Sequence, residues 1–207
     1  MKRIALFTAL LLGLYPLSAQ VVKIDAGATF SSMQDDTEMH QFTHNNTGAT
    51  VRIGVDWLEH EWFYLSSEVG YMATGGTDKI YIANGGGVQT NTVDWTMRRD
   101  NIHINTTFRA KLAYGSFHAY VGVGPKLDIP LNITMNDNLE SDYTTTFATR
   151  DIMFGIKTEV GAAYDINNLR LGINFAFLPD ITRQKSYLNQ TTRNNIFSLG
   201  VSVGYIL

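Results

Sequence analysis

The stretch "NIFSLGVSVGYIL" (residues 195–207) decides the fold, because from Phe197 to Tyr205 every second residue is apolar and the others are serine or glycine. A period of two predicts a β-strand with one apolar face. Ends of chains are usually polar and frayed. An apolar strand here is therefore expected to be held in a sheet, by pairing with a first strand near residues 22–30.

The same alternation occurs in seven more segments, namely 22–31, 51–57, 63–71, 102–114, 117–129, 154–165 and 169–177. In all eight segments the apolar set contains no charged residue, whereas the opposite set contains Lys23, Asp25, Arg52, Asp56, Glu68, Arg109, Lys111, Lys126, Asp128, Lys157, Glu159, Asp165 and Arg170. A soluble sandwich or lipocalin-like barrel would bury the apolar set. So many large apolar side chains would crowd a small barrel, but on its outside they can face lipid. The sequence therefore predicts an all-β fold, an eight-stranded antiparallel up-and-down transmembrane β-barrel.

The connections between these segments alternate in length. Short ones fall at 58–61, 115–116 and 166–168, and long ones at 34–48, 73–100, 130–150 and 179–194. Transmembrane barrels have short periplasmic turns and long extracellular loops. We therefore expect both termini at the periplasmic side of an outer membrane, with the long loops extracellular.

Aromatic residues mark both ends of the predicted strands, as in the girdles of membrane barrels. The periplasmic girdle is predicted to contain Trp57, Phe63, Tyr114, Phe117, Tyr164 and Tyr205, and the extracellular one Phe30, Tyr71, Phe154, Phe177 and Phe197. Pro125 falls inside the fifth strand, where it has no N–H to donate to a neighbour. A bulge or local break is predicted at that residue.

The remaining composition limits the class of protein. Residues 1–19 have a basic start, an apolar middle and a small-residue end, which predicts a signal peptide followed by a barrel domain at 20–207. The chain has no cysteine, so a disulfide framework and a lipoprotein anchor are excluded. The net charge of −3 argues against a nucleic-acid partner, because such proteins present a clustered basic surface.

The segments "YVGVGPKLDIPL" (residues 120–131) and "LGVSVGYIL" (residues 199–207) resemble small outer-membrane β-barrels of Gram-negative bacteria, of the PorT-like type and similar in plan to the outer-membrane protein X barrel. The resemblance implies contact with outer-membrane lipid and lipopolysaccharide, and assembly by the outer-membrane insertion machinery. It implies a C-terminal assembly signal at Val203, Tyr205 and Leu207, where leucine stands in place of the family's usual terminal aromatic. A monomer is expected.

Three groups of residues are candidates for a site. The first is a lumen charge network of Arg52, Glu68, Arg109, Lys111, Lys126, Lys157, Glu159 and Arg170. Buried charges need partners, and an eight-stranded interior is just wide enough for its side chains. This geometry favours a packed plug over a narrow ion path.

The other two groups are weaker candidates. Glu38, His40 and His44 lie in one loop, but their spacing aligns ligands only on a helix, so no metal or cofactor is expected. His103 and His118 point inward near opposite ends of their strands, and the spacing supports no Ser-His-carboxylate group. We therefore expect no enzyme activity.

The long loops are the remaining feature. Residues 78–95 alternate on both sides of a glycine run, which predicts a hairpin above the membrane. Aromatic residues at 81, 95, 143 and 187 make these loops candidates for binding a surface protein or glycan. The predicted role is structural or surface-binding; the alternatives are a small ion or solute channel and a lipid A-modifying enzyme.

Overall fold

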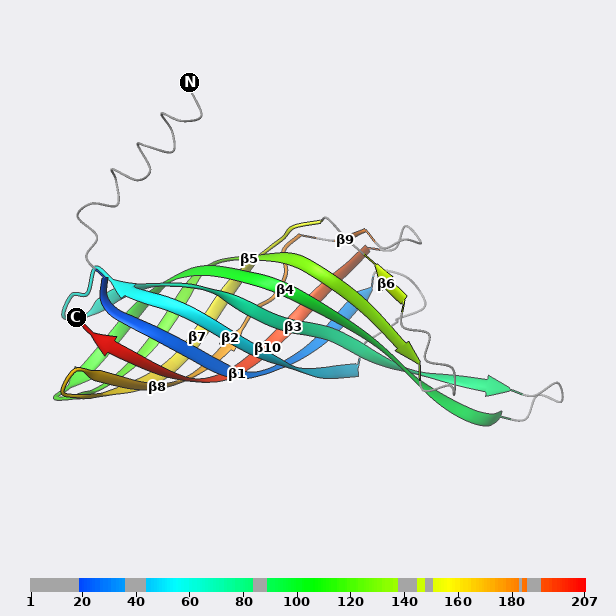
Figure 1. Ribbon diagram of the computed structural model, residues 1–207, viewed down its shortest axis with the longest axis horizontal. Helices are drawn as coiled ribbons and strands as arrows, with labels where there is room; N and C mark the ends of the chain where they lie inside the picture. The colour runs from blue at the N-terminus through cyan, green and yellow to red at the C-terminus, as the bar shows by residue number, and fades with distance from the viewer. Residues whose placement is uncertain are drawn as a thin grey trace, which may run out of the picture.

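The computed structural model describes residues 19–35, 44–83, 89–137, 145–147, 151–182, 184–185 and 191–207, which form a barrel of antiparallel strands (Figure 1). The eight long strands are β1 (Ala19–Asp35), β2 (His44–Trp57), β3 (Phe63–Ala83), β4 (Gln89–Tyr114), β5 (Phe117–Asp137), β7 (Met153–Ile166), β8 (Leu169–Phe177) and β10 (Thr191–Ile206). Short strands β6 (Thr145–Phe147) and β9 (Gln184–Lys185) pair with β5 and β10. Among the described residues, no helix has the length and apolar character needed to cross a membrane.

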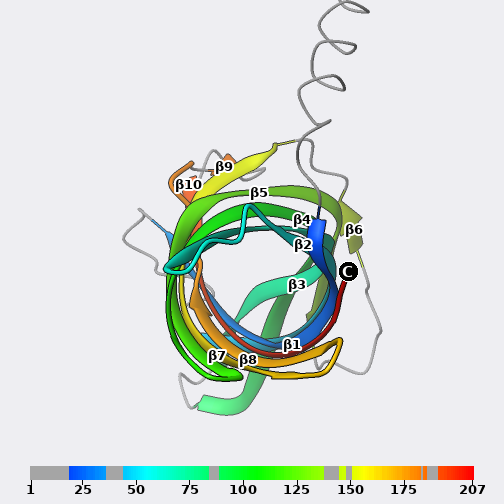
Figure 2. The same cartoon turned by 90° about the vertical axis from the view of Figure 1, so that its left-hand side faces the viewer.

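The predicted closure of the ring is confirmed. β1 pairs with β10 from Val21 opposite Ile206 to Asp35 opposite Thr192. Figure 2, which looks along the barrel, shows the strands enclosing a lumen. Closure removes the free strand edges that hydrocarbon does not tolerate. The apolar strand at the C-terminus is thus the eighth long strand of the barrel wall.

The strands are steeply tilted. Following cross-strand partners from one strand to the next leads from Asp25 to Arg52, Gly70, His103, Asp128 and Met153. Extending the registers of the remaining strand pairs leads on through residues 182 and 192 to Asp35. One circuit of the ring therefore starts at Asp25 and ends at Asp35, ten residues further along β1. With about 3.3 Å per residue and about 4.8 Å between strands, this stagger tilts eight strands by about 40°.

The barrel has the inside-out polarity that the alternation predicts. Ile53, Val121 and Val201 are 59%, 60% and 59% exposed on the outer face, whereas Arg52 and Lys157 are 1% and 0% exposed on the inner face. Exposed apolar side chains around the whole circumference need an apolar surrounding. This distribution is that of a membrane-spanning barrel.

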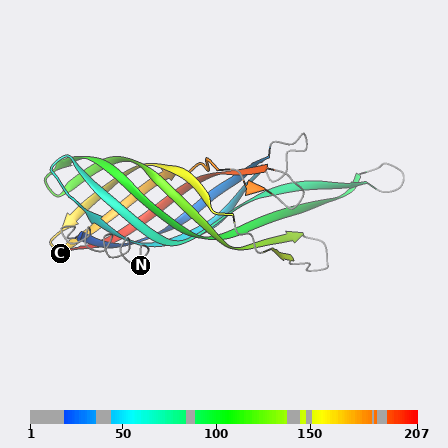
Figure 3. The same cartoon turned by 90° about the horizontal axis from the view of Figure 1, so that it is seen from above.

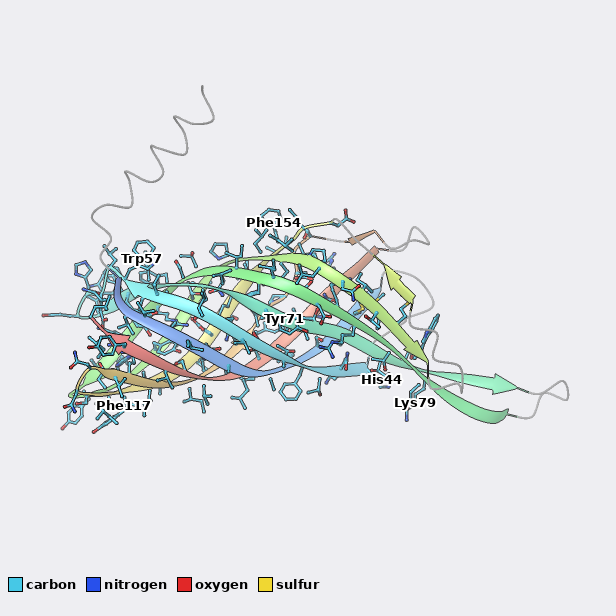
Figure 4. All side chains as sticks on the ribbon, viewed as in Figure 1. His44, Trp57, Tyr71, Lys79, Phe117 and Phe154 are labelled. Atoms are coloured by element: carbon cyan, nitrogen blue, oxygen red, sulfur yellow. The ribbon has the colours of Figure 1, made fainter. Side chains whose placement is uncertain are left out.

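The three short turns lie at one end of the barrel, which we call the turn end. Leu58, Gly115 and Asn167 have φ angles of 53°, 59° and 52° there, so each turn reverses through one residue in the left-handed region. Trp57 and Phe117 lie at this end in Figure 4. The other residues of the predicted turn-side girdle, which are Phe63, Tyr114, Tyr164 and Tyr205, also lie within two residues of the strand ends there.

At the opposite end the predicted hairpin over residues 78–95 is present, and several other strands extend further than the sequence predicts. β3 and β4 pair as far as Ala83 opposite Gln89, and their hairpin projects beyond the rest of the barrel (Figures 1 and 3). We call this the hairpin end. β1, β2, β5 and β10 also continue into the segments 34–48, 130–150 and 179–194, so those loop boundaries were too wide. Polar Thr- and Asn-rich sequence still forms strands there, because backbone pairing does not need an apolar face.

Of the bulge or local break predicted at Pro125, the structure shows the break. The β4–β5 register is the same on both sides of it, although Thr106 and Thr107 have no paired partner opposite. The Ile156 N–H donates to the Pro179 carbonyl at 3.2 Å, away from β5. The proline nitrogen consequently faces β4, where the ladder is interrupted without a register shift.

A bulge lies six residues further along the strand, at Leu131. Asn101 is opposite Pro130, but Asp100 is opposite Asn132, so Leu131 is an extra residue in β5. Beyond this bulge the inward positions of β5 change parity, and Ile133 is buried in the lumen.

Candidate functional site

The centre of the lumen is built around the carboxylate of Glu68 on β3. Its oxygens lie 2.9 Å from Lys23 Nζ, 3.0 Å from Arg109 Nη2 and 3.0 Å from Lys157 Nζ. Arg52 Nη1 is 3.5 Å away. Glu68 is 3% exposed, so four cations from four strands converge on one buried carboxylate.

Three further carboxylates complete this central network, which contains Lys23, Asp25, Arg52, Asp56, Glu68, Arg109, Lys157 and Glu159. Glu159 accepts hydrogen bonds from Arg109 Nε at 2.5 Å and lies 3.1 Å from Lys157 Nζ. Asp25 pairs with Arg52, and Asp56 lies 3.0 Å from Lys23 Nζ. Four cations face four anions, so the network is neutral, as buried charge requires.

Two tyrosines enclose the guanidinium of Arg109. Its Cζ lies 4.7 Å from the ring centroid of Tyr120 and 5.6 Å from that of Tyr64. Both rings are buried and meet edge to face at 6.0 Å. The alternation placed both residues on the polar face, but it did not indicate that they pack on a network cation through cation–π contacts.

A second group, the rim cluster, closes the turn end. Arg170 donates to Asp165 at 2.8 Å and to Glu59 at 3.2 Å, and Lys111 Nζ is 2.6 Å from Glu59. Burial raises the pKa of Glu59, but hydrogen bonds from Lys111 and Arg170 outweigh it and hold that pKa below its ordinary value. Two cations again meet two carboxylates. Lys111 and Arg170 thus belong to the rim, and Arg170 reaches the central network only through Asp56 at 3.8 Å.

A third group, the upper cluster, lies toward the hairpin end. Lys126 Nζ is 2.7 Å from Asp128 and 2.5 Å from Asp180. His103 Nδ1 is 2.5 Å from Asp128, and its Nε2 is 3.0 Å from Asn105 Nδ2. Because the Asn105 amide nitrogen can only donate, Nε2 is the acceptor and the ring proton is on Nδ1.

Asp180 is a residue that the sequence reasoning missed. It was assigned to the loop 179–194, but the backbone continues beyond β8: Asp180 N–H donates to Asn194 O at 2.9 Å, and Ile156 N–H donates to Pro179 O. The segment therefore still forms part of the wall, and the Asp180 carboxylate reaches Lys126. The sequence pattern did not predict this continuation, because Leu178 and Pro179 interrupt the alternation after Phe177.

Apolar layers cover the charges toward the hairpin end. Met72, Ala176, Leu178 and Ile196 form one buried layer, and Met33, Met97 and Ile133 form another, with Trp95 and Met135 packed against it. Most of these residues lie outside the predicted alternating segments; Met72, for example, follows the segment 63–71 and Met97 precedes the segment 102–114. An apolar layer inside the lumen was therefore not predicted.

Inward-facing glycines leave the room that these side chains need. A Cβ on Gly122 would meet Glu159 at 3.0 Å and Thr107 at 2.9 Å. A Cβ on Gly200 would meet Asp25 and Asn174 at 3.0 Å. These two glycines therefore lie where polar and charged side chains from neighbouring strands cross the lumen.

One small cavity lies within the charged part of the lumen. This cavity of about 10 Å³ lies beside Lys23, Asp56, Arg109 and Arg170, about the volume that one water molecule needs. The buried His103 has an aspartate and an asparagine as partners and no hydroxyl nucleophile. Within the described ranges no group of three His, Cys, Asp or Glu residues is arranged to hold a metal; Glu38 and His40 lie outside those ranges, and His44 is near Asp78 at 4.0 Å.

Comparison with known proteins identifies the fold. A major outer membrane protein from Thermus thermophilus has a similar structure, with 12% identity over 90% of this chain and 99% of that chain, and a TM-score of 0.52. The fold is that of the small outer-membrane β-barrels. Neisserial surface protein A is 14% identical over 88% of this chain and 96% of that one, with a TM-score of 0.45. The N-terminal barrel domain of Pseudomonas aeruginosa OprF is 12% identical over 91% and 98%, with a TM-score of 0.47.

At these identities the similarity extends to the fold alone. No family model matches the chain, and no curated protein matches its sequence. The PorT-like resemblance therefore stays a prediction.

Proposed function

We propose that this chain is an outer-membrane barrel with a plugged lumen, and that its β3–β4 hairpin binds a partner protein at the cell surface. The outer-membrane location is supported by the apolar outer face and by the fold shared with the Thermus protein. Periplasmic turns and an extracellular hairpin follow from the usual orientation of such barrels.

The observation that carries the proposal is the length of the hairpin. In the described residues, β3 is paired with β2 as far as Thr77, and β4 is paired with β5 as far as Trp95. β3 and β4 stay paired with each other further, as far as Ala83 opposite Gln89. Among the described residues no strand pairs with the outer backbone edges of this two-stranded ribbon beyond Thr77 and Trp95, so an extended peptide could add there as a further strand. Long strands that serve only to span lipid need no such extension, because about ten residues suffice.

Shortening the hairpin is expected to abolish partner binding without affecting the barrel. Lys79 is directly opposite Asp94, so replacing residues 80–93 with Asn-Gly leaves a two-residue turn of favoured geometry. A photo-reactive amino acid at Thr77 is expected to capture a surface protein in cells with the full hairpin and to capture none with the short one.

The control carries the same photo-reactive group at Glu61, an exposed residue of the turn end, and is expected not to capture that protein. Heat-dependent gel mobility shows that each variant assembles. Equal capture by the full and shortened hairpins, or no capture by either, would contradict the proposal.

The plugged lumen predicts that the protein does not conduct ions. The central network, rim cluster and upper cluster fill the lumen with paired charges, and the cavity beside Arg109 has room for about one water. Purified barrel added to planar bilayers in concentrated KCl is expected to show no current steps, while a porin in the same bilayer does. Reproducible steps that scale with protein added would favour the channel alternative.

A further inference from the structure

The apolar layer nearest the hairpin end is unusually rich in sulfur. Met33 from β1 and Met97 from β4 are 2% and 9% exposed and pack together with Ile133. Met135 and Trp95 are partly buried and pack against the same residues. We call Met33, Met97, Met135 and Trp95 the methionine cluster.

The registers bring these side chains together from two sides of the lumen. Met97 is directly opposite Met135 on the β4–β5 ladder, so their Cβ atoms are about 4.5–5.5 Å apart on one face. Trp95 is two residues from Met97 and shares that face. β1 is not a neighbour of β4 in the ring, so Met33 reaches this group across the lumen.

The other buried methionines have different surroundings. Met72 packs with the aliphatic side chains of Leu178 and Ile196. The sulfur of Met153 lies 2.9 Å from Arg99 Nη1, which donates a hydrogen bond to it. Among the described contacts neither Met72 nor Met153 has a second methionine beside it, so these two residues are suitable controls for the methionine cluster.

Three thioethers beside an indole have a specific chemistry. Thioether sulfur is a soft, uncharged ligand that selects Cu(I) over the hard divalent ions. An indole face attracts a cation placed over it. We propose that the methionine cluster is a binding site for Cu(I), with Met33, Met97 and Met135 as sulfur ligands and Trp95 beside the ion.

Silver(I) is the probe, because it is a soft monovalent ion that does not change oxidation state in the titration. The purified barrel in detergent micelles is titrated with silver nitrate in chloride-free buffer. The chain has three tryptophans, so Trp57→Phe and Trp62→Phe together leave Trp95 as the single indole reporter. We expect one equivalent of Ag(I), measured by calorimetry, to quench Trp95 fluorescence.

The ligand type is tested by pH. Thioethers do not take up protons, so the affinity at about pH 5.5 is expected to equal that at about pH 7.5, whereas histidine, with a pKa near 6.5, would lose affinity. The ligand positions are tested with Met97→Leu and Met135→Leu combined. Losing two of three ligands should weaken binding by at least the roughly 10–100-fold that loss of one outer-shell partner of a metal ligand costs. Met33→Leu alone should also weaken it.

The matched control combines Met72→Leu and Met153→Leu, which removes two sulfurs outside the cluster and should leave affinity unchanged. Heat-dependent gel mobility establishes that each variant is folded. The proposal is overturned by absence of a tight site in the wild-type barrel, by equal affinity of the two double variants, or by loss of affinity at the lower pH.

Discussion

Replacement of Glu68 by glutamine is expected to lower the free energy of unfolding of the barrel by about 3–5 kcal/mol, the usual cost of removing one partner from a buried ion pair. The amide is almost the same size, so the loss reports charge rather than a cavity. Lys23, Arg109 and Lys157 each lie within 3.0 Å of this carboxylate. Without it, four buried cations would face three anions.

Urea unfolding followed by tryptophan fluorescence in micelles measures this effect. Glu61→Gln is the matched control, because Glu61 is exposed in a turn and should change little. Adding Lys157→Met to Glu68→Gln restores the charge balance, so the double variant should be more stable than Glu68→Gln alone. If Glu68→Gln and Glu61→Gln behave alike, the central network does not stabilise the barrel.

Placing arginine on the outer face at mid-height is the second large effect that we expect. Val201 is 59% exposed and lies midway between Phe197 and Tyr205 on the outer face of β10. Val201→Arg should cost about 2–4 kcal/mol, because arginine is least tolerated at the bilayer midplane. The measurement is the fraction of heat-modifiable barrel in membranes and its urea midpoint in vesicles.

The same residue at the rim provides the control. Leu112 is 83% exposed and lies two residues from the end of β4 at the turn end. Leu112→Arg should cost only about 0–1 kcal/mol, because the guanidinium reaches the interface there. Equal costs at the two positions would be inconsistent with a membrane around this face.

The strands of the barrel wall could be predicted because each one has its own alternation of apolar and polar residues. In the segment 195–207, the alternation predicts both the strand and its outward face, and closure predicts that this strand pairs with the first one near residues 22–30. The exact register, with Val22 opposite Tyr205, comes from the structure. Pro125 shows where this reasoning stops. Whether a missing N–H disrupts a ladder depends on which neighbour it faces, and that is a property of the register.

The sequence predicts which charged residues face the lumen, but not which of them pair with one another. Alternation identifies inward charges, but Glu68 and Lys157 are 89 residues apart and meet only through the ring. Distance from the short turns places Lys111 and Arg170 nearer the turn end than Lys126, but it does not tell which carboxylates they meet. Asp180 and the inward methionines lie where the apolar and polar periods lose their contrast, so no periodic signal marks them.

The seam between β1 and β10 has a consequence for the order of folding. Val21 and Ile206 are partners at opposite ends of the described chain, so the pairing has very high contact order, which slows folding. The hydrogen bond from Asn174 on β8 to Asp25 on β1, at 2.5 Å, also requires closure, because β10 lies between these two strands in the ring. A partly synthesised chain can form hairpins, but it lacks the partners for several lumen charges. Assembly should therefore be a late, cooperative event that begins after synthesis of the last strand, rather than a strand-by-strand insertion.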